Sequence, residues 1–351
     1  MNFRTKRVPT AGWLTLNRIC NLRCEWCYAK DTEYLDSEVM ELDAACNTLA
    51  LMQRIGIQSV SLLGGEPSMY PHLESLIAYA QSLNIETVLI TNGVMLSDSR
   101  FVDCLFEAGL SHADLSLKGF DRVSFFDVTG YDYYDFVMDA VKNLSSGDHS
   151  FNVSFVLSAA TIPGLAQGLL DCYQNGARQF SLFFCNDCAG AFGTKVHSTP
   201  GEAYELAELF RKEYRHINTA TQGEFDLLQT LPLCAWNKEV VQMMRNANQI
   251  ESVCQLLHES GLVVSTDGSI IPCNSLYNIS LGDIASFWDK SRDEFLEYWN
   301  STNVTTTFNR LKALPGTACK GCKDYELCAG GCVIQWFNYS FEDFADGRRF
   351  L

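Results

Sequence analysis

Short apolar runs alternate with amphipathic stretches through the first 215 residues of the chain. Six of the runs are continuous and rich in branched or aromatic residues, which is typical of parallel strands covered on both faces. These runs are Trp13–Asn17, Ser59–Leu63, Glu86–Thr91, Asp114–Lys118, Asn152–Leu157 and Gln179–Phe184. Each precedes a stretch with the spacing of an amphipathic helix. These stretches are Asp43–Arg54, Pro71–Leu83, Ser97–Ala108, Tyr131–Leu144, Gly164–Gln174 and Pro200–Arg215.

Six strand–helix units in series predict an α/β fold with a parallel sheet and right-handed crossovers. Because six units are too few for a complete eight-fold barrel, we expect a partial (β/α)6 TIM-like barrel with ligands at the carboxyl ends of its strands. The alternation stops near residue 217, where INTATQGEF is interpreted as a polar connector. We therefore predict a core domain at residues 1–225 and a smaller cysteine-rich domain at residues 226–351.

Composition excludes several classes of protein. Hydrophobic residues make up 47% of the chain and charged residues 19%, which indicates a globular protein. The net charge of −16, without a run of Lys or Arg, argues against nucleic-acid binding and against docking on anionic membranes. We find no apolar stretch of membrane-spanning length and no secretory signal, so a cytoplasmic location is expected. In a reducing compartment, clustered cysteines more often bind metal or act in redox chemistry than form disulfides.

Three of the 15 cysteines, Cys20, Cys24 and Cys27, follow the first predicted strand with the spacing C-x3-C-x2-C. Three thiolates this close can share one metal centre and leave a coordination position open for a ligand. A zinc knuckle with a distant fourth ligand is the alternative interpretation.

The loop resembles the signature of the radical S-adenosylmethionine (SAM) superfamily, in which three cysteines hold a [4Fe–4S] cluster and SAM binds the fourth iron. The family usually has an aromatic residue before the third cysteine, and Trp26 matches. The second strand ends in a turn, Gly64, Gly65, Glu66 and Pro67, that is similar to the family's GGEP turn. That resemblance implies that the turn receives the methionine amino group of SAM; a plain glycine turn is the alternative.

Polar residues also end the third and fourth predicted strands. The segments ITNG and LSLKG are similar to family positions that contact the ribose and the carboxylate of SAM. The resemblance therefore implies SAM-binding roles for Asn92, Ser116 and Lys118, each of which could equally be a simple cap.

A second group of cysteines lies in the C-terminal part, in the run Cys319-x2-Cys322-x5-Cys328-x3-Cys332 and in the upstream pair Cys254 and Cys273. One or two structural zinc ions would suit such spacing. The pattern also resembles the SPASM extension of radical SAM enzymes, which holds two auxiliary [4Fe–4S] clusters. The resemblance implies one cluster on Cys254, Cys273 and Cys332, with Cys234 as a plausible fourth ligand, and another on Cys319, Cys322 and Cys328.

The chain departs from the SPASM pattern at two points. No cysteine follows Cys332, so the second auxiliary cluster lacks an evident fourth thiolate. The candidates for that position are Glu342, Asp343, Asp346, Cys185 and Cys188, or the site is open. In addition, sulfatase-maturing members have Asp directly after the equivalent of Cys273, whereas this chain has Asn274, which cannot act as a base.

Cys185 and Cys188 lie just past the sixth predicted strand, where substrate is expected. They are candidate catalytic residues as a cluster ligand, a hydrogen-atom donor or a redox pair, and two ordinary loop thiols are the alternative.

The resemblance implies an enzyme that accepts an electron from a flavodoxin- or ferredoxin-like donor, cleaves SAM to a 5′-deoxyadenosyl radical and abstracts a hydrogen atom from substrate. Relatives with SPASM extensions mostly modify ribosomally made peptides by cross-linking, epimerisation or oxidation, so a peptide substrate is the first hypothesis. The first strand is predicted to begin at Trp13, which leaves no room for a leader-peptide recognition domain; a separate protein or the barrel rim would serve instead. A small-molecule substrate, such as an amino sugar or amino acid derivative, and a non-catalytic iron–sulfur or zinc scaffold are the alternatives.

Overall fold

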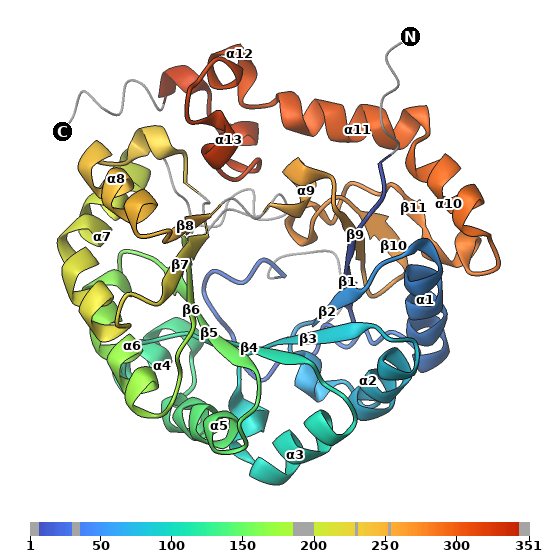
Figure 1. Ribbon diagram of the computed structural model, residues 1–351, viewed down its shortest axis with the longest axis horizontal. Coiled ribbons are helices and arrows are strands. Elements are labelled where there is room, and N and C mark those ends of the chain that lie inside the picture. The colour runs from blue at the N-terminus through green and yellow to red at the C-terminus, as the bar shows by residue number, and fades with distance from the viewer. Residues whose placement is uncertain (1–6, 30–35, 185–199, 229–230, 252–253, 344–351) are drawn as a thin grey trace.

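The computed structural model describes residues 7–29, 36–184, 200–228, 231–251 and 254–343 (Figure 1). Within these residues, eleven strands form one sheet in the order β11-β10-β9-β1-β2-β3-β4-β5-β6-β7-β8. The strands are β1 Ala11–Thr15, β2 Ser59–Leu63, β3 Glu86–Thr91, β4 His112–Leu117, β5 Phe151–Leu157, β6 Phe180–Phe184, β7 Phe225–Leu228, β8 Ile250–Glu251, β9 Gly261–Val264, β10 Ser269–Ile271 and β11 Gly282–Asp283.

The six predicted strands correspond to β1–β6, and each runs parallel to the next. Figure 1 shows the sheet curving around a central space with the helices outside it, so the predicted α/β partial barrel is confirmed. The helices on the first part of the chain are α1 Leu42–Ile55, α2 Leu73–Ser82, α3 Ser99–Glu107, α4 Arg122–Thr129, α5 Tyr134–Ser146, α6 Leu165–Gln174 and α7 Pro200–Ala220.

Helix α4 was not predicted, because the stretch is short and its apolar residues lack a clean helical spacing. It begins at a capping box, in which the Asp121 side chain accepts from the backbone N–H of Ser124 and the Ser124 side chain caps Asp121 in return. Gly130 ends it in the left-handed conformation with φ of 76°.

The parallel sheet extends beyond six strands. The segment interpreted as a polar connector instead forms the last turns of α7 and the start of β7, which pairs in parallel with β6. At the other side, β9 pairs in parallel with β1, so a late segment of the chain joins the first strand. Both added strands are short, which explains why the alternation along the sequence did not reveal them. The division of the chain into two domains stays a prediction.

The C-terminal part adds mainly short helices: α8 Lys238–Asn246, α9 Gln255–His258, α10 Arg292–Trp299, α11 Thr302–Ala313, α12 Gly316–Lys320, α13 Tyr325–Cys328 and α14 Gln335–Asn338. Single 3-10 turns are η1 Pro67–Met69, η2 Val94–Ser97, η3 Ile162–Gly164, η4 Leu233–Ala235, η5 Asn274–Leu276 and η6 Ile284–Phe287. Figure 1 shows α11–α13 lying across the open side of the barrel, between β8 and β9.

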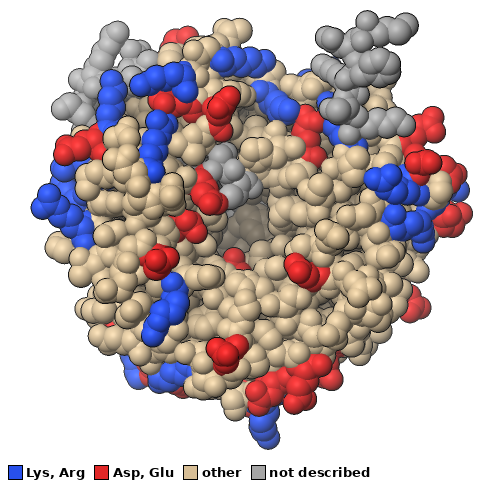
Figure 2. Space-filling view, in the orientation of Figure 1, with Lys and Arg blue, Asp and Glu red and all other residues tan. Residues whose placement is uncertain are grey.

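One continuous core joins the sheet to its helices. Val60, Leu62 and Leu89 from β2 and β3 are fully buried, as are Leu49 from α1 and Leu76 from α2. Burying each such side chain stabilises the fold by about 1.5–3 kcal/mol. The space-filling view shows that the centre of this face is hollow (Figure 2). Among the described helices, none combines the length and apolar character that crossing a membrane requires.

Candidate radical SAM site and C-terminal cysteine centre

The predicted SAM-site residues lie at the carboxyl ends of four neighbouring strands, β1 to β4. Because parallel strands end at the same edge of a sheet, segments far apart in sequence meet there. These segments are the loop with Cys20, Cys24 and Cys27 after β1, Gly64–Pro67 after β2, Asn92 after β3 and Lys118 after β4.

The two glycines of the turn after β2 pack directly on the chain that leads to Cys20. A Cβ on Gly65 would lie 2.4 Å from the carbonyl oxygen of Ile19, and one on Gly64 would lie 2.8 Å from Asn17 Oδ1. The backbone N–H of Gly65 donates to the Asn17 carbonyl at 2.8 Å, and that of Glu66 donates to the Ile19 carbonyl at 2.6 Å. Glycine is therefore required at both positions by contact between two segments of the protein.

Glu66 ties this turn to the end of β3. Its side chain is 1% exposed. One carboxylate oxygen accepts from the Thr91 hydroxyl at 2.6 Å and from the N–H and hydroxyl of Ser68, while the other accepts from the Asn92 N–H at 2.7 Å. Four donors thus satisfy a carboxylate that burial has removed from water. The carboxylate is therefore occupied by contacts within the protein, and it holds the turn against the end of β3.

Asn92 connects β3 to the cysteine loop. Its side-chain N–H donates to Asn21 Oδ1 at 2.7 Å, and the same nitrogen lies 4.0 Å from Cys20 Sγ. The Asn92 side-chain oxygen accepts from the Val94 N–H at 3.0 Å. The structure thus brings Asn92 close to the first cysteine and also gives it a capping contact, while its role in SAM binding stays a prediction.

Ser116 and Lys118 lie together at the end of β4. The Lys118 ammonium donates to the Ser116 hydroxyl at 2.6 Å. Burial raises the pKa of Cys24, whereas the nearby positive charge of Lys118 lowers it. Lys118 therefore lies near the cysteine loop and favours the thiolate form that binds metal.

The cysteine loop is a partly buried, electrostatically coupled group of thiols. Burial raises the pKa of Cys20 to about 11, and the charges of Glu66, Cys24 and Cys27 add to the rise. Within the described residues, no three Cys, His, Asp or Glu side chains converge tightly enough to hold one metal ion.

Arg18 is a site residue that the sequence pattern did not reveal. Two residues before Cys20, its guanidinium donates to the Thr266 hydroxyl at 2.9 Å and to the Ser265 hydroxyl at 2.8 Å. Arg18 is 8% exposed, and its partners follow β9, about 250 residues later in the chain. No local spacing could indicate this contact, because it exists only once β9 has paired with β1.

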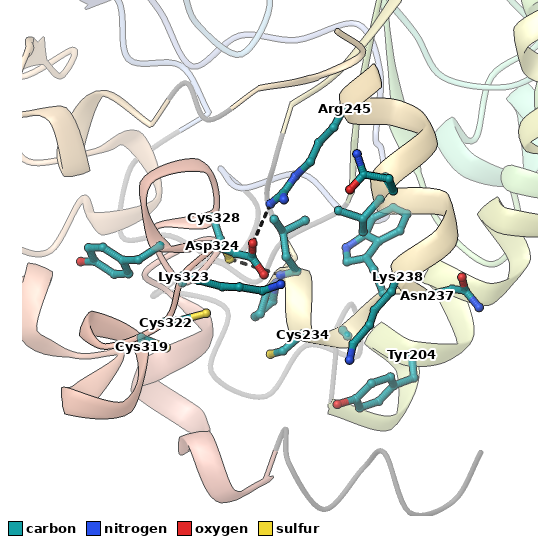
Figure 3. Close-up of a pocket in the computed structure, with 18 of the residues that line it drawn as sticks. Tyr204, Cys234, Asn237, Lys238, Arg245, Cys319, Cys322, Lys323, Asp324 and Cys328 are labelled. Carbon is teal, nitrogen blue, oxygen red and sulfur yellow. Dashed lines mark hydrogen bonds and ion pairs between the residues drawn. The ribbon is translucent and has the colours of Figure 1, made fainter. Parts of the chain in front are cut away.

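A second group of cysteines borders a cavity of about 890 Å³ between η4, α8 and the α12–α13 segment (Figure 3). Cys234, Cys319, Cys322 and Cys328 all line it. Burial raises the pKa of Cys319 to about 11, and nearby Cys234, Cys328 and Cys322 add to the rise. The sequence pattern placed Cys234 with Cys254 and Cys273, but in the structure it lies beside the other set.

Cys254 and Cys273 form a separate pair. Burial raises the pKa of Cys273 to about 11, and the nearby Cys254 thiolate adds to the rise. Cys332 is half-buried, and its place in this set stays a prediction. Asn274, the residue after Cys273, accepts at Oδ1 from the Thr15 hydroxyl at 3.5 Å.

Three of the remaining candidates, Cys185, Cys188 and Asp346, lie outside the described residues. Trp26 is half-buried within the cysteine loop. Pro67 is buried as the first residue of η1, where a missing N–H costs nothing.

A further cavity, of about 610 Å³, lies at the opposite edge of the sheet, where β4–β7 begin. His112, Asn152 and Asp114 line it and form a chain of hydrogen bonds, with 2.7 Å between His112 Nε2 and Asn152 Oδ1 and 3.4 Å between Asn152 Nδ2 and Asp114 Oδ1. Burial raises the pKa of Asp114. None of the predicted site residues within the described ranges borders this cavity.

An open parallel α/β barrel with three coupled cysteines after its first strand defines the radical SAM class of proteins. Comparisons with known proteins support the same class. Residues 14–158 match the model of the radical SAM superfamily. A PqqA peptide cyclase of Methylocella silvestris is 32% identical over 341 residues, which cover 96% of this chain and 86% of that protein. The chain therefore belongs to the radical SAM superfamily of SAM-dependent enzymes.

Two further similarities cover different lengths of the chain. A GTP 3′,8-cyclase of Chlorobaculum tepidum is 33% identical over 133 residues, but the match spans only 37% of this chain and 39% of that protein. The crystal structure of Streptococcus suis SuiB bound to the precursor peptide SuiA superposes with a TM-score of 0.70 at 19% identity, over 93% of this chain and 72% of that chain. The fold of the chain is thus similar to that of SuiB over nearly its whole length, and its family implies SAM and a [4Fe–4S] cluster as cofactors.

Proposed function

We propose that this protein reductively cleaves SAM and uses the resulting 5′-deoxyadenosyl radical to modify a ribosomally made peptide by cross-linking, epimerisation or oxidation. The observation that carries the proposal is the meeting of Cys20, Cys24 and Cys27 with Glu66, Asn92 and Lys118 at one edge of the sheet. A [4Fe–4S] cluster on these thiolates would supply the electron that breaks a sulfonium bond of bound SAM and leaves a radical able to remove hydrogen from an unactivated C–H.

The residues around the cysteines have distinct roles in this proposal. Glu66 positions the turn after β2, which would receive the methionine amino group of SAM. Lys118 offers a positive charge that suits the SAM carboxylate, and Ser116 holds that ammonium through its hydroxyl. Asn92 follows β3 and contacts the cysteine loop, so it fixes the position of the loop relative to the strand.

The extent of the similarities favours a peptide over a small molecule. The match to the GTP cyclase spans only 37% of this chain, whereas the match to the PqqA peptide cyclase spans 96% and so includes the C-terminal cysteines. The similarity to SuiB, solved with a peptide bound, supports the same choice at the level of fold. Substrate recognition depends on the parts beyond the SAM site, so the whole-chain similarity is the more informative one.

Several partners belong to the same proposal. The two C-terminal cysteine sets would hold auxiliary [4Fe–4S] clusters, which could take up the electron left on the substrate. A flavodoxin- or ferredoxin-like protein would supply the first electron. A separate recognition protein, or the rim of the barrel, would bind the leader segment of the peptide.

The proposal is tested by anaerobic reconstitution with iron and sulfide, followed by incubation with SAM, dithionite and a precursor peptide encoded beside the gene. We expect 5′-deoxyadenosine in the chromatogram and a change in peptide mass that both depend on SAM. Bound SAM without any 5′-deoxyadenosine would instead support a non-catalytic scaffold. 5′-Deoxyadenosine with an unchanged peptide, but turnover of an amino sugar or amino acid derivative, would identify a small-molecule enzyme.

A further inference from the structure

The C-terminal run of cysteines supplies only three residues to its own centre under the proposed function. Cys319, Cys322 and Cys328 come from α12, α13 and the turn between them. A [4Fe–4S] cluster that only transfers electrons is normally held by four cysteines. The fourth ligand must therefore come from elsewhere in the chain, or the centre keeps an open iron.

Cys234 reaches this centre from a segment almost a hundred residues earlier. It lies in η4, next to Leu233, whose backbone N–H donates to Cys328 Sγ at 3.2 Å. That hydrogen bond fixes η4 against α13 and brings Cys234 to the wall of the same cavity. Figure 3 shows the side chains of Cys234 and Cys322 reaching into the same space from these two segments.

The surroundings of the cavity suit a negatively charged inorganic group. Its charged lining is three cations, Lys238, Lys323 and Arg245, against two carboxylates, Glu208 and Asp324. Arg245 pairs with Asp324 at 3.0 Å. Four thiolates around an iron–sulfur core carry net negative charge, which neighbouring cations offset. Hydrogen bonds to cluster sulfurs are a usual part of such a site, and the Leu233 N–H already points at one of the sulfurs.

The two described carboxylates that were candidates for the fourth ligand, Asp343 and Glu342, do not line the cavity. Asp343 is exposed, and its carboxylate accepts from the N–H and the hydroxyl of Ser340 at 2.7 and 2.9 Å, which closes a local turn. Glu342 is exposed and does not line the cavity. Of the described candidates, Cys234 is therefore the one whose thiol already shares the space with the other three.

We propose that Cys234 is the fourth ligand of the cluster held by Cys319, Cys322 and Cys328. This inference rests on the proposed function, because it assumes that the C-terminal cysteines hold iron–sulfur clusters. It leaves Cys254, Cys273 and Cys332 as a set of three. A centre closed by Cys234 has no position free for substrate, so its role is to carry electrons.

The assignment is tested in a protein that carries Cys20→Ala, Cys24→Ala and Cys27→Ala, so that all bound iron is auxiliary. Into this background we would introduce Cys234→Ala, Cys322→Ala, both together, and the exposed Cys104→Ala as a control. Iron per chain is measured after exposure to a chelator. Loss of about four irons is expected in each of the first two variants, with no further loss in the double variant and none in the control.

Alkylation followed by peptide mass spectrometry gives a second readout that also reports folding. In the reconstituted background, Cys234 and Cys273 should both be protected. In the Cys322→Ala variant, Cys234 should become reactive at least tenfold faster while Cys273 stays protected, which shows that the rest of the protein is still folded.

The opposite pattern would overturn the assignment. If Cys234 stays protected in Cys322→Ala but becomes reactive in Cys273→Ala, it belongs to the other set. Iron content unaffected by Cys234→Ala would exclude it as a ligand altogether. Absence of auxiliary iron from the background protein would remove both this inference and the auxiliary clusters, whereas failure of SAM cleavage in the unmodified protein would count against the proposed function alone.

Discussion

The two cysteine centres of this protein are assembled in different ways. Cys20, Cys24 and Cys27 lie within eight consecutive residues of one loop, and neighbouring strand ends hold that loop in place. The C-terminal cavity instead collects Cys234 and Cys328 from segments joined by a contact across 95 positions. The first centre can thus be recognised from local spacing, whereas the composition of the second depends on how distant segments pack. The following predictions act on one centre and use the other as reference.

The largest effect is expected from replacing Cys20, Cys24 and Cys27 with Ala. Formation of 5′-deoxyadenosine should fall to the level without enzyme, because no thiolate remains to hold the cluster that binds SAM. Auxiliary iron should remain, at about eight of about twelve irons per chain if every cluster has four irons. Chromatography of the nucleoside and iron analysis of the same sample check both points; an iron content near zero would show that the two centres do not assemble independently.

Glu66→Gln should have the next largest effect. The substitution keeps the shape of the side chain but removes the charge and one acceptor from a buried network of four donors. We expect a loss of about 2–3 kcal/mol in unfolding free energy and roughly a tenfold decrease in SAM cleavage, with auxiliary iron unchanged. Denaturant unfolding measures the first quantity, and Glu86→Gln on the exposed start of β3 is the control. Equal stability of the two variants would contradict the role given to Glu66.

Gly65→Ala and Gly321→Ala compare the two cysteine segments directly. A Cβ at Gly65 would lie 2.4 Å from a carbonyl oxygen, whereas at Gly321 the nearest atom is 3.9 Å away. Gly65→Ala should destabilise the protein by about 1–3 kcal/mol and weaken SAM binding, because the turn can no longer rest on the cysteine loop. Gly321→Ala should change stability by less than about 0.5 kcal/mol. Thermal unfolding and SAM titration of both variants test the contrast, which fails if Gly321→Ala is the more damaging change.

Arg18→Lys should have a smaller effect than Gly65→Ala. Lysine keeps the positive charge but cannot donate to Ser265 and Thr266 in the same forked geometry. We expect a loss of about 1 kcal/mol in stability, with both centres still able to bind iron. The measurement is denaturant unfolding combined with iron analysis; a substantial loss of iron would mean that this contact controls cluster assembly as well.

Much of the fold could be predicted from the sequence. The runs at Ser59–Leu63 and Glu86–Thr91 correspond residue for residue to β2 and β3, because buried parallel strands require continuous apolar residues. The strands that escaped prediction, β7 to β11, have two to four residues each and thus too short a pattern to detect. The interpretation of the segment after residue 217 as a connector was also wrong. A polar helix end followed by a short strand resembles a linker in the sequence.

The site residues likewise divide into those that the sequence could identify and those that it could not. The spacing of Cys20, Cys24 and Cys27, and the polar residues that end β2, β3 and β4, could be identified from the sequence because each signal lies within a few residues. The role of Glu66 as an internal anchor could not, since its partners Thr91 and Asn92 belong to another strand.

The sequence by itself determined the α/β class, the first six strands and the three-cysteine loop, since all of these depend on interactions between residues close along the chain. Only the tertiary structure decided that Arg18 contacts Ser265 and Thr266 and that Cys234 lies beside Cys328. Such pairs are selected by the packing of whole strands and helices, and no spacing along the chain records which distant segments that packing brings together.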